Sequence, residues 1–133
     1  GVDPSRWHRM RRDMNLIRDI LLEAESDEGL HVCNIGLAFT LEGHSDDSVG
    51  YHVRLLVEGG YLMGTSIGPN MVPSVQGLTW KGHDFLDATR PKGIWERILD
   101  AVAKVGAMTL DTVVEIAKEL AKQQFRAAAG LSP

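Results

Sequence analysis

Three polar side chains, Ser48, Tyr51 and Arg54, recur on one side of a segment with helical periodicity. In a helix these positions lie on neighbouring turns, so their hydroxyl and guanidinium groups would point outward together. Arginine donates a fork of hydrogen bonds that suits the edge of guanine, and serine or tyrosine can bind phosphate. The pattern is compatible with DNA contact. The alternative is an ordinary solvated helix face, since polar residues cover most helices on the side away from the core.

Histidine and cysteine are common ligands of transition metals, and after the first nine residues they occur at five positions: His31, Cys33, His44, His52 and His83. His31 and Cys33 are two residues apart and would share one side of a strand. No second pair has the short spacing that defines zinc sites. We therefore expect packed or exposed histidines, a small buried thiol, and neither a metal nor another cofactor.

The neighbouring His83 and Asp84 resemble the histidine–aspartate pair of metal phosphohydrolases, which need further ligands on other helices. No histidine follows residue 91. The glycines that could form a phosphate-binding loop are not followed by the lysine and hydroxyl residue that such a loop needs; they are Gly59, Gly60, Gly64 and Gly68. We expect a protein that is not an enzyme.

The elements that would position these residues begin with a helix over residues 12–25, where apolar side chains recur at three- and four-residue spacing. Residues 30–43 favour extended structure, although part of this segment could also form a short helix. Ser45 is placed to cap the next helix, which Gly59 and Gly60 end. The inward side of that helix is expected to carry Val49, His52, Val53 and Leu56.

Residues 61–64 predict a short strand, and residues 65–77, rich in glycine, proline and turn-forming residues, predict a hairpin loop from which Leu78 returns. Thr79 is placed to cap a helix that runs to about Thr89. Two longer amphipathic helices are predicted over 93–105 and 110–124. A helix, a second helix and then a two-stranded wing is the element order of winged-helix proteins.

Composition fits a small folded domain with an added helical element, since 44% of the 133 residues are apolar and 24% are charged. The single cysteine, Cys33, excludes an internal disulfide and fits a reducing compartment. No apolar run approaches the length of a membrane span, and no basic-then-apolar leader is visible. We expect a cytoplasmic protein with no membrane partner.

The net charge of −4 is unevenly distributed. Residues 10–90 hold six basic against twelve acidic residues, whereas residues 91–133 hold six basic and five acidic residues. The acidity therefore lies in the part that would have to meet DNA phosphates. The predicted loop at 65–77 contains no lysine or arginine. Because this acidic surface disfavours DNA phosphates, a protein partner remains the alternative to DNA.

Three motifs together resemble a known family: "MRRDMNLIRDIL" at 10–21, "YHVRLLVEGGYL" at 51–62 and "LTWKGHDFLDATR" at 78–90. The family is phage- and prophage-associated and is catalogued as domain of unknown function 2513. The resemblance runs from Met10 to about Leu131. It implies a winged-helix-like fold and a phage or prophage setting, without an established activity. The likeness to winged-helix repressors implies that Asp47, Ser48, Tyr51 and Arg54 form the exposed reading face.

The expected fold class is α+β and mostly helical, with a winged-helix core at 10–90 and a C-terminal helical extension at 91–133. We interpret residues 1–9 as a cloning remnant or a disordered arm, with a native basic arm as the alternative. Because twofold dimers are the most frequent oligomers, we expect a homodimer through the C-terminal helices. The residues expected at its interface are Ile94, Trp95, Ile98, Val102, Val113 and Leu120.

The expected function is a winged-helix DNA-binding or regulatory protein of phage or prophage origin, with double-stranded DNA as its partner. The alternative is a non-catalytic winged-helix module that binds a host or phage protein through the same helix or its acidic surface.

Overall fold

The computed structural model describes residues 12–26, 41, 43–65, 73–106 and 108–130. Within these ranges the chain is α+β and mostly helical, as expected, with five helices and one two-stranded sheet. The interpretations of residues 1–9 and of the segment at 30–43 lie outside the described residues, apart from positions 41 and 43. The chain divides into two compact units, Gly1–His83 and Asp84–Pro133. The elements in order are α2 (Met14–Ser26), α4 (Asp46–Glu58), β1 (Leu62–Thr65), β2 (Ser74–Leu78), α5 (Trp80–Thr89), α6 (Ile94–Val105) and α7 (Leu110–Ala128).

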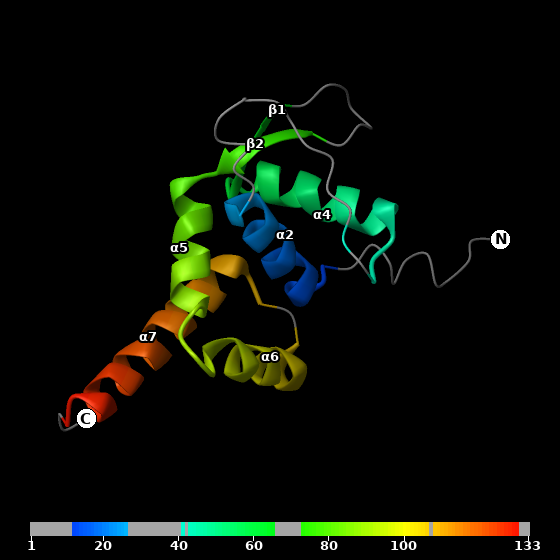
Figure 1. Ribbon diagram of the computed structural model, residues 1–133. Helices are drawn as coiled ribbons and strands as arrows, with labels where there is room; N and C mark the ends of the chain where they lie inside the picture. Colours follow the sequence, from blue (N-terminus) through cyan, green and yellow to red (C-terminus); the bar gives the residue numbers. More distant parts are fainter. Residues whose placement is uncertain (1–11, 27–40, 42, 66–72, 107, 131–133) are drawn as a thin grey trace. The chain divides into compact units, whose positions relative to one another are not determined.

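Helix α2 confirms the helix predicted over 12–25. Its apolar stripe is buried and consists of Leu16, Ile17, Ile20, Leu21 and Ala24. The helix packs against β2 and against α4, beside which it lies in Figure 1, so its buried stripe forms part of the core of the first unit. The sequence did not identify the residue that starts α2. Asp13 accepts hydrogen bonds through Oδ1 from the backbone N–H groups of Asn15 and Leu16, and therefore acts as its N-cap.

Helix α4 forms where the sequence predicts it, and Val49, His52, Val53 and Leu56 are buried on its inward side. It ends at Gly59, and Gly60 follows with a φ of +84°, a conformation that side chains with a Cβ rarely adopt. The N–H of Gly59 bonds to the carbonyl oxygen of Leu55, which closes the last turn. The chain can then reverse directly into β1.

Strands β1 and β2 pair antiparallel, with Leu62 opposite Leu78 and Thr65 opposite Ser74. The register shifts between Met63 and Gly64, which marks a bulge. The prediction of a hairpin loop over 65–77 is wrong at its end, because β2 already begins at Ser74. Burial explains the difference: Val75 is fully buried, so packing outweighs the turn-forming composition of this stretch.

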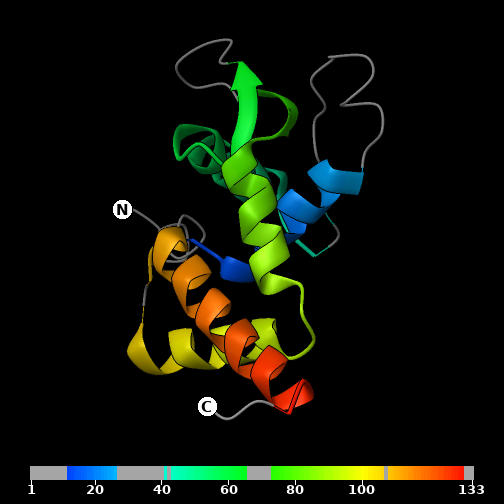
Figure 2. The ribbon, with the colours of Figure 1, turned by 90° about the vertical axis from the view of Figure 1, so that its left-hand side faces the viewer.

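Helices α6 and α7 pack on each other in the second unit, as Figure 2 shows for α7 (orange to red) where it crosses α6 (yellow). Both confirm the helices predicted after residue 91, although α7 extends beyond residue 124 to Ala128. Thr109 caps α7 by accepting a hydrogen bond from the N–H of Thr112 at 3.1 Å. The side-chain amide of Gln124 donates to the carbonyl oxygen of Lys92 at 3.1 Å, which ties α7 to the turn before α6.

Candidate functional site

The start of α4 is fixed by its own first residues. Ser45 adopts extended backbone angles, and its Oγ accepts a hydrogen bond from the N–H of Ser48 at 3.2 Å. Asp46 and Asp47 follow in the first turn and are exposed. Their negative charges complement the positive end of the helix dipole. The same two carboxylates lie close to any ligand that binds at this end of α4, and they would repel an anionic one.

The position of α4 is set by His52, whose side chain is completely buried. Its Nε2 accepts a hydrogen bond from the backbone N–H of Asp13 at 2.9 Å. Because an amide N–H can only donate, Nε2 is unprotonated and Nδ1 carries the proton. Nδ1 then donates to the carbonyl oxygen of Ser48 at 2.7 Å. One imidazole therefore joins the middle of α4 to the capping residue of α2.

The predicted reading face lies on the opposite side of α4. Asp47 is exposed, and Ser48, Tyr51 and Arg54 are half-buried, so each of the four keeps surface that a ligand can reach. The Tyr51 ring meets His52 edge to face, with ring centroids 5.7 Å apart. Among the described residues Arg54 has no ion-pair partner. The face thus offers hydroxyl and guanidinium donors to phosphate or base edges, flanked by a carboxylate.

The hairpin after α4 is held by a contact between its strands, in which the side-chain amide of Gln76 donates to Oγ1 of Thr65 at 2.8 Å. The loop residues 66–72 lie outside the described residues. The expectation of a non-basic wing tip therefore rests on its sequence. In the described part of the hairpin, β1 carries a large apolar side chain at the surface, Met63, which is exposed to 47%.

The first turn of α5 is fastened to the turn that ends α4. Oγ1 of Thr79 donates to the carbonyl oxygen of Gly60 and accepts from the N–H of Gly82 at 3.1 Å. The ammonium group of Lys81 lies 4.6 Å from the centre of the Tyr61 ring. A Cβ on Gly82 would collide with the Tyr61 carbonyl oxygen. These contacts explain why a threonine and a glycine stand three residues apart in this motif.

The residues expected at a dimer interface lie in the second unit. Ile94, Trp95, Ile98 and Val113 are buried within the chain, and the rings of Trp95 and Phe85 meet edge to face at 6.1 Å. Val102 and Leu120 are half-buried. Dimerisation remains a prediction. A second chain would meet the residues that α6 and α7 leave accessible.

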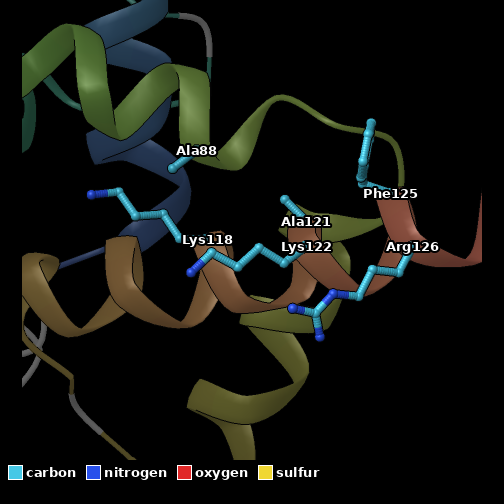
Figure 3. Close-up of a pocket in the computed structure, with 6 residues that line it drawn as sticks. All are labelled: Ala88, Lys118, Ala121, Lys122, Phe125 and Arg126. Carbon is cyan, nitrogen blue, oxygen red and sulfur yellow. The ribbon is translucent and has the colours of Figure 1, made fainter. Parts of the chain in front are cut away.

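A basic surface on α7 was missed by the sequence reasoning. Lys118, Lys122 and Arg126 follow one another at intervals of four residues and are all exposed. They line a pocket of about 410 Å³ together with Ala88, Ala121 and Phe125. Figure 3 shows Ala88 reaching the pocket from α5 and the other five side chains from α7. The interval of four was the available signal, because it places cations on one helical face.

Among the described residues no group of three or more histidine, cysteine, aspartate or glutamate side chains is placed to hold a metal ion. His31 and Cys33 lie outside the described ranges. His44 is half-buried, and His83 and its neighbour Asp84 are exposed. None of the described helices has both the length and the apolar character that crossing a membrane requires.

Comparison with known proteins relates the chain to a family model and to a bacterial protein. The family model, described as hypothetical protein (DUF2513), matches residues 11–109. An uncharacterized protein of Haemophilus influenzae (strain KW20 Rd) is 29% identical over 119 residues, which cover 87% of this chain and 99% of that protein. No solved structure matches the chain.

Proposed function

The chain belongs to the DUF2513 family of hypothetical proteins, and from its own geometry we propose that it is a DNA-binding protein of the winged-helix type, with a regulatory and non-catalytic role. A cytoplasmic location is part of the proposal, and so is a phage or prophage setting, which the family resemblance implies. Double-stranded DNA is the proposed partner.

The observation that carries the proposal is the placement of α4. This helix packs on α2 with its apolar side, and the antiparallel β1–β2 hairpin follows after only a glycine turn. In winged-helix proteins such a helix enters the major groove, and its exposed residues contact base edges. Here the buried His52 holds the helix against its support, which a reading helix requires.

Arg54 is the residue we propose to read a base or bind a phosphate, because it is only half-buried and its guanidinium is always charged. Tyr51 and Ser48 lie beside it and would donate to phosphate oxygens. Asp47 opposes phosphate approach at the start of the helix. We therefore expect modest affinity for DNA of arbitrary sequence, and a larger share of the affinity from specific contacts.

The experiment that tests the proposal is a mobility or anisotropy assay with a generic DNA duplex at low salt. We expect binding that weakens steeply as salt rises, because bound cations release counterions from the duplex. Absence of binding at low salt would refute the DNA-binding proposal. A labelled neutral polymer of the same length serves as the control, because its binding would come from the label and not from the DNA phosphates.

A second candidate, a non-catalytic module that binds a protein, is favoured by two exposed apolar side chains of the first unit. Trp80 is exposed to 84% and Met63 to 47%. Tryptophan is enriched among the residues that dominate the binding energy of protein interfaces. Replacement of Trp80 by alanine should leave duplex binding unchanged and should abolish capture of a partner if the protein serves this role.

We further propose that the protein forms a twofold dimer through its C-terminal helices. The support is Val105, which is exposed to 75% at the end of α6, one turn after the half-buried Val102. Burial of an exposed apolar side chain against a second chain removes its surface from water, which stabilises the dimer. The interface would then include Val102 of the predicted set and would extend to Val105.

A further inference from the structure

The exposed side of α7 carries a row of three cations. Lys118, Lys122 and Arg126 are separated by four residues each, so successive side chains start about 6 Å apart along the helix axis. Residues at this interval share one face of a helix. The row therefore presents its charges to a single ligand lying along α7.

These cations have little internal neutralisation. Lys118 lies 4.0 Å from Glu115, and both side chains of this pair are more than half exposed. Ion pairs between exposed side chains are weak, so Glu115 neutralises Lys118 only slightly. Lys122 and Arg126 have no ion-pair partner among the described residues, and no acidic residue follows Glu119 in the sequence. The C-terminal half of α7 is therefore locally positive in a chain whose net charge is negative.

An apolar hollow lies beside the row. Ala88 and Ala121 are half-buried in it, and the Phe125 ring stands at one end with 69% of its surface exposed (Figure 3). The hollow has a volume of about 410 Å³, within the size range of pockets that bind small organic groups. A ligand that fits has a flat apolar part for Phe125 and negative charges at intervals for the cations.

We propose that this α7 surface, defined by Ala88, Lys118, Ala121, Lys122, Phe125 and Arg126, binds single-stranded nucleic acid. Phosphates lie along the lysines and the arginine, and an unpaired base stacks on Phe125 over the alanines. Sites for single strands combine these two features, a positive track and an exposed aromatic ring. The site is separate from the proposed duplex contact of α4, and neither depends on the other.

Two other occupants fit less well. A second copy of α7 laid on this face would place cations against cations, which is unfavourable. An acidic peptide would pair with the cations but would leave the Phe125 ring and the alanine floor uncovered. A nucleotide strand covers both parts of the surface, because each unit has a charged phosphate and a π face.

The test uses the full chain and a fluorescent oligothymidine of about ten nucleotides, a length within the range of known single-strand sites. Binding is followed by anisotropy as salt is varied. Three phosphate contacts predict a slope of log affinity against log salt of about −2. A duplex of the same length and a polyglutamate peptide serve as competitors.

Two variants of matched charge separate this surface from general attraction. Lys122→Ala with Arg126→Ala should reduce the magnitude of the slope by about 1.4. Lys104→Ala with Arg97→Ala removes the same charge from exposed positions of α6 and should leave the slope unchanged. Phe125→Leu keeps an apolar side chain without a ring, and should weaken binding between about fivefold and about 100-fold.

Several results would overturn the proposal. One is the absence of oligothymidine binding at low salt. Another is an equal reduction of the salt slope in the two double variants, and the third is an unchanged affinity in Phe125→Leu. Stronger competition by polyglutamate, lost in the Lys122 and Arg126 variant, would assign the surface to an acidic protein segment instead. Arg54→Ala should not affect oligothymidine binding, so this test is independent of the fate of the duplex proposal.

Discussion

The imidazole Nε2 of His52 accepts a hydrogen bond from the backbone N–H of Asp13 at 2.9 Å. Asp13 in turn caps α2 through its carboxylate, so one buried side chain connects the start of α2 with the middle of α4. The other ring nitrogen bonds to Ser48, which lies on the proposed reading face. The orientation of that face therefore depends on a histidine in the core.

Replacement of His52 by leucine should destabilise the protein by about 2 kcal/mol. Leucine fills a similar volume but has no ring nitrogens, so the partly buried hydrogen bonds to the Asp13 N–H and to the Ser48 carbonyl oxygen would both be lost. Urea unfolding measured by circular dichroism gives the free energy of unfolding.

The control for this variant is His83→Leu, which makes the same exchange at an exposed position of α5. It should change the free energy of unfolding by less than about 0.5 kcal/mol. His52→Gln retains a hydrogen-bond acceptor, so its free energy of unfolding should fall less than that of His52→Leu. Equal stability of the His52 and His83 leucine variants would contradict a role for the Asp13 contact.

Replacement of Gly82 by alanine should cost about 3 kcal/mol. The new Cβ would collide with the Tyr61 carbonyl oxygen and would lie 3.1 Å from Cδ2 of Leu78, so the start of α5 would have to move away from the turn after α4. Thermal unfolding of the full chain reports the loss as a lower melting temperature.

Gly60→Ala separates collision from backbone strain. Gly60 has a positive φ, but a Cβ there would meet no atom within 4 Å. The expected cost is about 1 kcal/mol from the left-handed conformation alone. If both glycine variants lose the same stability, close packing is not the reason for glycine at position 82.

Much of the fold could be predicted from local patterns. The stripes of α2, α4, α6 and α7 follow helical periodicity, and Ser45, Thr79 and Thr109 are caps whose hydrogen bonds involve residues only three positions away. Strand β2 was placed too late because turn-forming residues at its start outweighed Val75 in the pattern. Pairing with β1 decides this boundary, and pairing is a contact between segments distant in sequence.

The site was less predictable for the same reason. Helical spacing was sufficient to place Ser48, Tyr51 and Arg54 on one face, and to place His52 inward. The Asp13 partner of His52 is 39 residues away, and no local pattern indicates it. The hollow beside Phe125 needs Ala88 from another helix, which spacing within α7 cannot reveal.

Replacement of Asp46 and Asp47 by asparagine should strengthen duplex binding if α4 meets DNA. At a separation of about 8 Å in water, a unit charge interacts with a phosphate by about 0.5 kcal/mol, so each aspartate removed should raise affinity roughly twofold. Anisotropy titrations at low salt measure the change. A protein partner that recognises the acidic surface would instead bind the asparagine variant more weakly.

Replacement of Arg54 by alanine should reduce the salt slope of duplex binding by about 0.9, the contribution of one phosphate contact. Arg54→Lys keeps the charge and should retain the slope, but it loses the planar fork that reads guanine. Arg97→Ala, on α6, is the matched control and should behave like the unaltered protein. An unchanged slope in Arg54→Ala would exclude this residue from phosphate contact.

Replacement of Val105 by lysine should shift the proposed dimer toward monomers. Burial of a valine side chain contributes about 1.5 kcal/mol, and a twofold interface loses two of them, so the dissociation constant should rise about 100-fold. Lysine suits the C-terminal end of α6, where it complements the helix dipole, so folding should be preserved. Sedimentation velocity over a range of concentrations measures the equilibrium. A dimer that persists in the variant would place the interface elsewhere, and a monomer at every concentration of the unaltered protein would exclude the dimer itself.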